Sequence, residues 1–315
     1  MNELVPVLET LVREVESGRP AALCTVVKTH GSTPRGPGTA MLVRADGTTV
    51  GTVGGGQVEA ATRRVACELL TQNRSSRFDS ALDHDCQSED GMICGGQVQV
   101  AITTYAATAQ LDPIRMALAA AHRRQAARIP LLIEHAGQTL EYGLHVEVPP
   151  TLVVAGAGHV GQAVAKLGGD LGFRVVVIDD RADLLAAATL NSAAERIAGD
   201  IAATLADYPL DASCYVVIVT RGHQYDLQAL QAVIERPTAY IGMMGSRRKV
   251  AAVLAAVAQA GVSQDCIDRV HAPIGLPIGG VTVPELAVSI GAELIQVRRK
   301  VTPKLVDGPR EVESR

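Results

Sequence analysis

The sequence predicts an α/β protein with a doubly wound parallel sheet in its C-terminal half and a mixed α/β domain in its N-terminal half. From residue 151 onward, apolar strand segments alternate with helical segments, which is typical of parallel sheets. The stretch GAGHVG follows the first of these strands and opens a helix, which favours a Rossmann-like arrangement. Pro149-Pro150 separates this rhythm from a first half of hairpins and single helices. We therefore expect one domain over residues 1–148 and a second over residues 151–315.

The first half is predicted to combine helices, hairpins and a glycine-rich loop. Apolar residues recur at helical spacing between Leu4 and Val15, and Asp46-Gly47 is a strong turn signal. In chain order we expect a helix from Leu4, a strand at 22–29, a loop at 31–38, a hairpin at 40–53, a helix at 57–70, an irregular polar stretch at 74–90, a strand ending near 105, a helix at 112–128 with Asp112 as its N-cap, and a polar hairpin at 131–148.

The second half is predicted to be a run of βα units. Short Val- and Ile-rich stretches are each followed by a turn and a longer Ala-rich stretch. We expect strands at 151–155, 174–178, 214–219 and 239–243, and helices near 159–171, 226–235, 247–260 and 284–299.

Composition narrows the class of protein. Hydrophobic residues make up 47% of the 315-residue chain, which suffices for sizeable cores. The net charge is −4 and no long basic block is present, so we expect no nucleic acid partner. No apolar stretch reaches 18 residues and the N-terminus lacks the pattern of a signal peptide, so we expect no membrane association. The six cysteines show no CxxC pair, which favours a cytoplasmic protein with reduced thiols.

The clearest binding motif is the glycine loop of the second half. Gly156 permits a tight turn, Gly158 lets the backbone approach a diphosphate, and Gly161 lets the helix pack closely on the strand. Asp179-Asp180 ends the next strand about twenty residues later, where a ribose hydroxyl is bound in nucleotide-binding proteins. His159 lies within the loop and is expected to face a ligand. The alternative is a tight βα turn that binds nothing.

Two glycine clusters of the first half are further candidates. Gly54, Gly55 and Gly56 feed a predicted helix N-terminus that would suit an anion, and Glu59 lies in the first turn of that helix. The alternative is a turn whose glycines serve close packing. Cys94 precedes Gly95 and Gly96, which would leave its thiol accessible, although a lone cysteine is more often a small buried hydrophobe.

Polar residues also cluster after three strands of the second half. Because ligands bind at the carboxyl ends of strands in open α/β sheets, these clusters are expected to line a site. For the histidine, a surface or capping role is the alternative, and the arginine after Ser246 could simply be solvated. The residues are Arg221 and His223 in TRGHQYD, Gly245, Ser246 and Arg247 in GMMGSRR, and the stretch 272–279.

Taken together, these stretches resemble the XdhC/CoxI family of accessory proteins for molybdenum hydroxylases. The similar motifs span nearly the whole chain in the family's order. They are GSTPRGPGTAMLV, GTVGGGQVE, GMICGG, VVAGAGHVGQAV, VIDDR, VTRGHQYD, YIGMMGSRRK and APIGLPIGGVTVPELAVSIGAELI. One departure is that family members often carry Cys where this chain has Gln57. A thiolate role at that position is therefore excluded.

The resemblance implies a chaperone that receives the molybdenum cofactor, as molybdopterin or its dinucleotide form. Such a protein holds the cofactor while a cysteine desulfurase supplies sulfur, and then passes it to an apo molybdenum hydroxylase of the xanthine dehydrogenase type. The resemblance also implies that Cys94 contacts molybdenum or handles sulfur. This points to cofactor maturation more than to catalysis, and the absence of an evident acid–base motif agrees with it.

Two other functions are also compatible with the sequence. An NAD(P)-dependent oxidoreductase would explain GxGxxG and Asp179 but not the glycine clusters of the first half. A scaffold that binds no cofactor is the other alternative.

Two expectations concern assembly. The apolar face of the last helix could pack on its own sheet or on a second copy, and we expect a homodimer or larger homo-oligomer; this face contains Leu286, Ile290, Leu294 and Val297. Because one cofactor has a metal–pterin end and a phosphate end, we also expect residues from both domains to face one cleft. These residues are Arg35, Glu59, Cys94, His159, Arg221 and His223.

Overall fold

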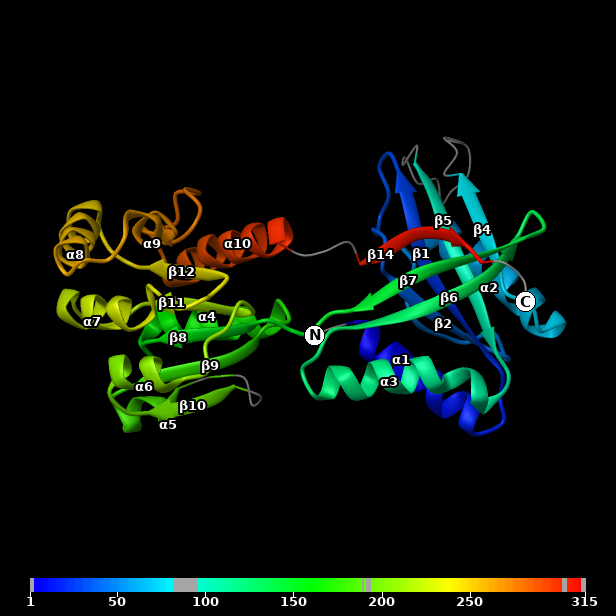
Figure 1. Cartoon of the computed structure of the whole chain (residues 1–315), viewed down its shortest axis with the longest axis horizontal. Helices are drawn as coiled ribbons and strands as arrows, with labels where there is room; N and C mark the ends of the chain where they lie inside the picture. The colour runs from blue at the N-terminus through cyan, green and yellow to red at the C-terminus, as the bar shows by residue number, and fades with distance from the viewer. Residues whose placement is uncertain (1–2, 82–95, 189, 191–193, 302–304, 313–315) are drawn as a thin grey trace. The chain divides into compact units, whose positions relative to one another are not determined.

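The computed structural model describes residues 3–81, 96–188, 190, 194–301 and 305–312 (Figure 1). The chain divides into two compact units, and each is described by itself. One unit contains the N-terminal residues up to Val148 together with the last strand, and the other extends from Pro149 to the end of the last helix. This division places the C-terminal strand with the first unit, whereas the sequence suggested that the second domain continues to residue 315.

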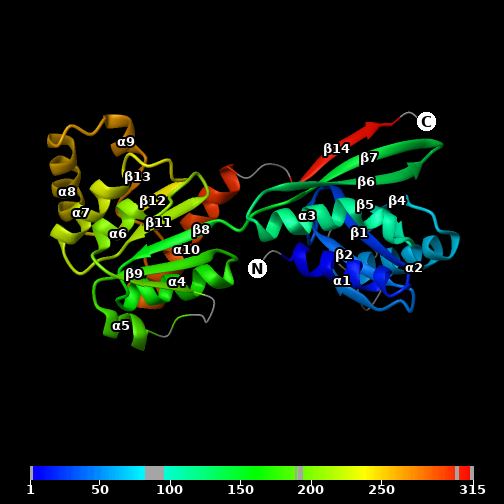
Figure 2. The same ribbon diagram turned by 60° about the horizontal axis from the view of Figure 1, so that its bottom comes forward.

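An eight-stranded, mostly antiparallel sheet forms the N-terminal unit, in the order β14-β7-β6-β4-β5-β1-β2-β3. The last strand of the chain pairs with β7 (Figure 2). Asp307 on this strand accepts hydrogen bonds from Arg128 and from His145, if that ring nitrogen carries the proton. The strands are β1 (Ala21–His30), β2 (Ala40–Arg44), β3 (Thr49–Gly51), β4 (Ser76–Ala81), β5 (Gln97–Tyr105), β6 (Ala127–His135), β7 (Gln138–Val146) and β14 (Val306–Glu311).

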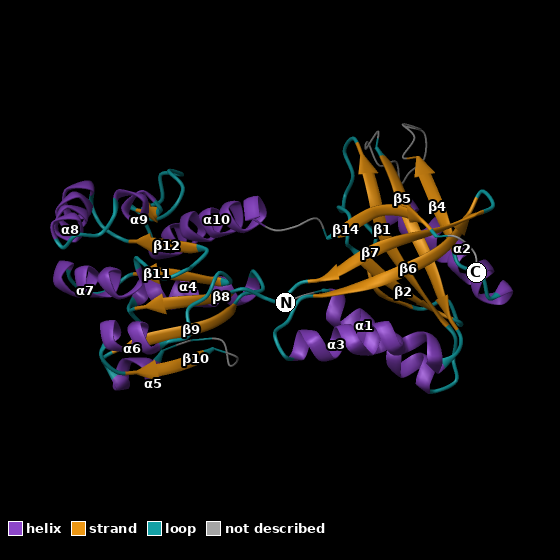
Figure 3. Cartoon of the chain, in the orientation of Figure 1, coloured by secondary structure: helices purple, strands orange, loops and turns teal. Residues whose placement is uncertain are grey.

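Six parallel strands form the sheet of the C-terminal unit, in the order β10-β9-β8-β11-β12-β13 (Figure 3). Numbered from β8, this is the 3-2-1-4-5-6 order of the Rossmann fold, with the switch of direction between β8 and β11. The predicted fold class is therefore confirmed. The strands are β8 (Thr151–Ala155), β9 (Arg174–Asp179), β10 (Glu195–Ala198), β11 (Cys214–Ile218), β12 (Tyr240–Met243) and β13 (Val270–His271).

Helices cover both faces of this parallel sheet. Successive residues of β8 point to opposite faces, so that Leu152 and Val154 join one core and Val153 and Ala155 join the other. The first core is closed by α4 (His159–Asp170), α5 (Ala182–Ala187) and α10 (Val283–Val301). The second is closed by α6 (Ile201–Asp207), α7 (His223–Val233), α8 (Arg247–Gln259) and α9 (Gln264–Asp268).

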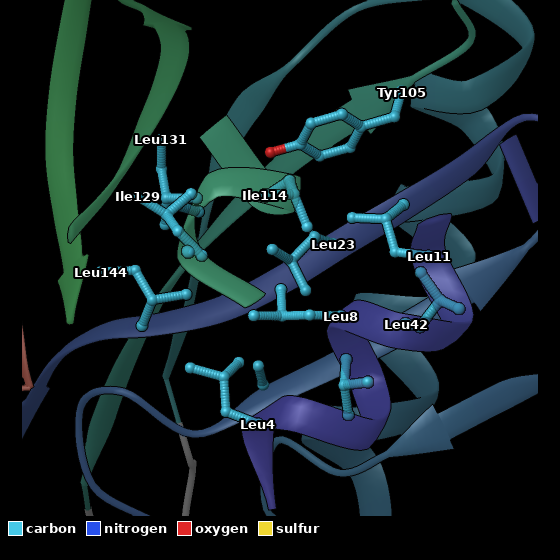
Figure 4. Packing of buried hydrophobic residues seen from close by; sticks show 14 of the residues in the cluster. Leu4, Leu8, Leu11, Leu23, Leu42, Tyr105, Ile114, Ile129, Leu131 and Leu144 are labelled. Atoms are coloured by element: carbon cyan, nitrogen blue, oxygen red, sulfur yellow. The ribbon is translucent and has the colours of Figure 1, made fainter. Parts of the chain in front are cut away.

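The helices of the N-terminal unit also lie on two faces. Leu8 and Leu11 of α1 (Leu4–Glu16) and Ile114 of α3 (Asp112–His122) pack with Leu23 and Leu42 of the sheet in one core (Figure 4). The opposite core is closed by α2 (Gly56–Gln72). This second helix begins at the glycine cluster, so packing of the sheet fixes where the glycine turn lies.

Three local predictions for the N-terminal unit are wrong. Asp112 is the first residue of α3 and not its N-cap, because a 3₁₀ turn over Thr108–Leu111 already leads into the helix. That helix ends at His122, well before residue 128, because Arg124 has a φ of +60°. The polar stretch from residue 74 contains the strand β4, which pairs with β5.

The apolar face of α10 is buried within its own unit. Ile290 and Leu294 are 2% and 1% exposed and pack in the core that α4 also closes. Gly291 faces the side chain of Leu167 on that helix. Of the two alternatives for this face, the structure shows packing on its own unit. This apolar face therefore gives no support to the expected homo-oligomer, which stays a prediction.

Candidate functional site at the carboxyl edge of the parallel sheet

The predicted site residues of the second half gather at one edge of the parallel sheet. They follow the carboxyl ends of β8, β9, β11 and β12, which all point the same way. Backbone hydrogen bonds join the loops to neighbouring strands: Val219 N–H donates to Ala155 and Met244 N–H to Ile218, each over 2.9 Å. The glycine loop lies next to the switch between β8 and β11, the usual place of a ligand in such sheets.

The three glycines of the GAGHVG loop differ in what they do. Gly156 has a φ of +118°, and a Cβ on it would lie 2.5 Å from the Val219 carbonyl oxygen. A Cβ on Gly161 would lie 1.8 Å from the Gly156 carbonyl oxygen, so the fold itself requires both glycines. Gly158 precedes α4 with a φ of −66°, and a Cβ there would meet no described residue within 4 Å beyond its chain neighbours. The space in front of Gly158 is therefore open to a ligand.

Asp179 ties the glycine loop to the end of β9. Its side chain is 1% exposed and accepts a 2.7 Å hydrogen bond from the Ala157 backbone N–H. It also accepts hydrogen bonds from the backbone and guanidinium of Arg181. Burial alone would raise the pKa of Asp179, but the hydrogen bonds from Arg181 and Ala157 outweigh it and lower this pKa to about 2.

This depressed pKa predicts a pH-dependent contribution to stability. Because the folded pKa lies below the ordinary value of 3.8, the contribution is present above pH 4 and is lost as the pH falls toward 2. We expect Asp179→Asn to lower the free energy of unfolding by roughly 2 kcal/mol at neutral pH. Urea unfolding at pH 7, 5 and 3 checks this. A gap between wild type and variant that stays constant down to pH 3 would contradict the assignment.

Asp180 and Arg221 form an ion pair across the same edge. Arg221 Nη2 donates to Asp180 over 2.6 Å and to the Tyr225 hydroxyl over 2.7 Å, and its guanidinium lies 4.4 Å from the centre of the Tyr225 ring. His159 at the start of α4 and His223 at the start of α7 are both exposed. The two histidine side chains are therefore accessible to a ligand at the predicted edge of the sheet.

An ion pair between a buried carboxylate and a half-buried lysine, which the sequence motifs did not indicate, connects two of the loops. Asp226 in the first turn of α7 is fully buried, accepts a 2.6 Å hydrogen bond from the Thr220 hydroxyl and pairs with Lys249 of α8. The ammonium group of Lys249 also donates to the Met244 carbonyl over 3.3 Å. Asp226 appears in TRGHQYD as one more polar residue, and only the fold shows that it faces Lys249.

The third loop starts from Gly245 and leads into α8. Ser246 is the N-cap of this helix and its hydroxyl accepts a hydrogen bond from the Lys249 N–H. Arg247 and Arg248 are exposed, and within the ranges that the structure describes neither forms an ion pair. Cations at a helix N-terminus oppose the helix dipole, so an anionic ligand would stabilise this arrangement.

The stretch 272–279 is anchored by α10. Glu293 accepts hydrogen bonds from the Gly275 N–H over 2.8 Å and from the Tyr240 hydroxyl over 2.6 Å, and it contacts His271 over 3.1 Å. Burial would raise the pKa of Glu293, but its hydrogen bonds from His271, Tyr240 and Gly275 outweigh this and lower it. This carboxylate is therefore an ionised anchor for the loop.

The first-half glycine cluster is held by its own helix. Gly54, Gly55 and Gly56 all have positive φ values, which explains why glycines occupy this turn. Glu59 accepts hydrogen bonds from the Gly55 N–H and the Thr52 hydroxyl, so it closes the turn. The packing alternative for this cluster is thus well supported, and its binding role stays a prediction.

Glycines from two other motifs lie against the loop at 31–38. A Cβ on Gly54 would lie 2.8 Å from the Pro34 side chain, and a Cβ on Gly96 would lie 2.3 Å from the Ser32 carbonyl oxygen. The structure therefore brings together three segments of the first half that are far apart in sequence. Arg35 in this loop is exposed and pairs with Glu3 over 3.4 Å.

Cys94 and Gly95 lie outside the described residues. The expectation that residues of both halves face one cleft concerns the two units together and stays a prediction.

Other surface features lie away from these motifs. Cavities of about 630 Å³ near the β6–β7 turn and about 480 Å³ near Tyr208 contain none of the predicted site residues. Among the residues that the structure describes, no three His, Cys, Asp or Glu side chains are grouped as a metal site would require, and no helix has the length and apolar character to span a membrane. Of the described cysteines, Cys24 and Cys214 are buried, and burial raises the pKa of Cys24.

The chain is similar in sequence to known proteins over most of its length. The chain is 30% identical over 295 residues to the uncharacterized protein YqeB of Escherichia coli (strain K12); the match covers 93% of this chain but 46% of that protein, so the chain spans about half its length. It is 25% identical over 307 residues to the molybdenum cofactor insertion chaperone PaoD of the same organism, covering 93% of this chain and 88% of PaoD. It is 24% identical over 344 residues to a probable xanthine dehydrogenase subunit of Bacillus subtilis (strain 168), covering 96% and 99% of the two chains.

A solved structure and two family models agree with this. A crystal structure described as a xanthine dehydrogenase from Bacillus halodurans superposes with a TM-score of 0.79 at 22% identity, covering 96% of this chain and 97% of that one, which shows a shared fold. The model of the XdhC and CoxI family matches residues 14–79, and that of the XdhC Rossmann domain matches residues 152–294. The chain belongs to the XdhC and CoxI family.

Proposed function

We propose that this protein is a chaperone that binds the molybdenum cofactor and inserts it into an apo molybdenum hydroxylase of the xanthine dehydrogenase type. The observation that carries the proposal is the open space at Gly158, beside the N-terminus of α4 and the cationic loops of the same sheet edge. The name of the relative PaoD supports the same cargo.

The residues at this edge fit the phosphate end of such a cargo. The first N–H groups of α4 lack partners within the helix and can donate to phosphate oxygens once a ligand approaches Gly158. Arg221 and Arg247 are exposed on neighbouring loops and add positive charge. A carrier has to bind and release its cargo without transforming it, and helix N–H groups and guanidinium groups are well suited to binding phosphate.

In this proposal the protein holds the cofactor while a cysteine desulfurase supplies its sulfur, as the family resemblance implies. The apo-hydroxylase then receives the sulfurated cofactor. Self-association forms no part of the proposal, since the apolar face of α10 that motivated it is buried.

Extraction of bound small molecules tests the proposal. The protein is purified from a host that makes the cofactor, acid-treated, and its extract examined by fluorescence and mass spectrometry for pterins. We expect a pterin in near-stoichiometric amount and activation of an apo-hydroxylase by the loaded protein. Release of NAD(P) without a pterin, or turnover of a small substrate with NAD(P), would favour an oxidoreductase. Absence of any bound small molecule would favour a scaffold.

Cys94 gives a separate prediction about sulfur. The family resemblance implies that its thiol contacts molybdenum or handles sulfur, and in the sequence Cys94 directly precedes two glycines, Gly95 and Gly96. We expect Cys94→Ser to lower transfer of sulfurated cofactor about tenfold or more, with pterin content at the wild-type level. Cys266→Ser, at a half-buried cysteine of the other unit, is the control. Unchanged hydroxylase activation by the Cys94 variant would assign that residue a structural role.

A further inference from the structure

The residues at the end of β9 bear on whether the cargo carries a nucleoside. In a Rossmann unit that binds a dinucleotide, a carboxylate at the end of the second strand accepts hydrogen bonds from the ribose hydroxyls. In this protein the second strand is β9 and the carboxylate is Asp179. Its hydrogen bonds therefore show whether a ribose can be bound there.

Asp179 has no acceptor capacity left. It accepts four hydrogen bonds: from the Ala157 N–H over 2.7 Å, from the Arg181 N–H over 3.0 Å, and from Arg181 Nε and Nη2 over 2.8 Å each. A carboxylate offers about four lone-pair positions, so all of them are occupied. The side chain is also 1% exposed. Ribose hydroxyls would have to displace donors that already satisfy a buried charge.

The neighbouring carboxylate is also paired. Asp180 accepts a 2.6 Å hydrogen bond from Arg221, and its other oxygen lies 3.8 Å from Arg181 Nε. Because the sheet order is β9-β8-β11, the pair of Asp180 and Arg221 joins the loops on both sides of β8. It therefore lies beside the glycine loop, where a nucleoside would have to pass toward β9.

At the end of β9, the most exposed side chains are those of Arg181 and Arg221, and both are hydrogen-bond donors. The Arg181 and Arg221 side chains are 37% and 43% exposed, against 1% for Asp179 and 30% for Asp180. Guanidinium groups match the geometry of phosphate oxygens and offer no acceptor to a ribose hydroxyl. Resting on the proposed function, we propose that the cargo is the phosphate-terminated form of the cofactor, a pterin phosphomonoester, and that a nucleoside is excluded from this end of β9.

The form of the bound cargo tests this proposal directly. The protein is expressed in a host that makes both the phosphomonoester and the dinucleotide forms, and the released ligand is weighed by mass spectrometry. We expect the phosphomonoester. A dinucleotide would overturn this inference and leave the chaperone function standing. If no pterin is released, the proposed function fails and the inference with it.

Competition among simple probes gives an independent test. Inorganic pyrophosphate, ADP, CDP and GDP are titrated into the full chain, and we expect the nucleoside to improve affinity by less than about twofold. A tenfold preference for any nucleoside diphosphate over pyrophosphate in the wild type would overturn the proposal, whatever the variants do.

Two matched variants locate the cause. Arg181→Ala removes two of the four donors to Asp179, so we expect ADP to gain about tenfold over pyrophosphate in this variant. Arg174→Ala removes an arginine of similar exposure that pairs with Glu195 at the other end of β9, and it should leave the ratio unchanged. An equal gain in both variants would contradict the role of Arg181.

Discussion

Replacing Gly158 with valine is expected to reduce affinity for the cofactor, or for pyrophosphate as a probe, on the order of 100-fold. A valine side chain would fill the space in front of the N-terminus of α4 and keep phosphate oxygens from its N–H groups. Loss of two charge-assisted hydrogen bonds at about 1.5 kcal/mol each gives about 3 kcal/mol, which corresponds to that factor. Calorimetric titration of wild type and variant measures it.

The same variant should remain folded. Gly158 has φ and ψ of −66° and −179°, which valine adopts without strain, and the added side chain has no described neighbour beyond the adjacent residues. Valine is a poorer N-cap than glycine, so a loss of about 1 kcal/mol in stability is expected. Equal affinity of wild type and folded variant would exclude this loop as the binding site.

Gly161→Ala is the matched control. Its Cβ would lie 1.8 Å from the Gly156 carbonyl oxygen, so the loop or the helix must move. We expect a cost of about 3 kcal/mol in unfolding free energy, as for other overpacked positions. The two glycines of one motif thus separate binding from folding, a distinction that the sequence pattern GxGxxG does not contain.

The parallel sheet was predictable because its strands are buried on both faces. Strands β8, β9, β11 and β12 are continuous apolar runs followed by longer helical segments, and periodicity identifies such runs. By contrast, β10 is a four-residue edge strand in which half-buried and exposed residues alternate, and β13 has two residues. These elements are too short for a periodic signal, and pairing with neighbours defines them.

The unpredicted strands of the first unit are defined by contacts distant in sequence. β4 carries Arg77 and Asp79, whose side chains form an ion pair, and Arg77 also contacts His135 of β6. Its polar sequence therefore gave no strand pattern. β14 contains Gly308 and Pro309 and is held through Asp307 by partners more than 160 residues away. Local sequence does not carry such information.

The location of the candidate site could be predicted from the sequence, but the roles of its individual residues could not. Strand-end motifs identified the loops that the fold brings to one edge, because parallel strands all end there. The role of Asp179 depended on its neighbours, since only the structure shows Arg181 folded back onto its carboxylate. The pairing of Asp226 with Lys249 likewise depended on the packing of α7 against α8.

Lys249→Met should destabilise the C-terminal unit by about 3 kcal/mol. The substitution leaves the carboxylate of Asp226 fully buried without its cation, and breaking a buried pair by removing one partner costs about 3–5 kcal/mol. The lower end applies because the Lys249 side chain is 28% exposed. Urea unfolding measures the loss. Lys166→Met, at an exposed lysine of α4, is the control and should change stability by less than about 0.5 kcal/mol.

A double variant separates the charge from the packing. Asp226→Asn combined with Lys249→Met removes the buried charge together with its partner, while the amide oxygen can still accept from the Thr220 hydroxyl. We expect it to recover at least half of the lost stability, since replacing both members of a buried pair costs far less than removing one. Because the pair links the loop at Thr220 to the Met244 carbonyl, hydrogen exchange in both loops should rise in the single variant and fall back in the double one. If the single and double variants are equally destabilised, Lys249 acts through packing of its aliphatic chain, and the two loops are not coupled by charge.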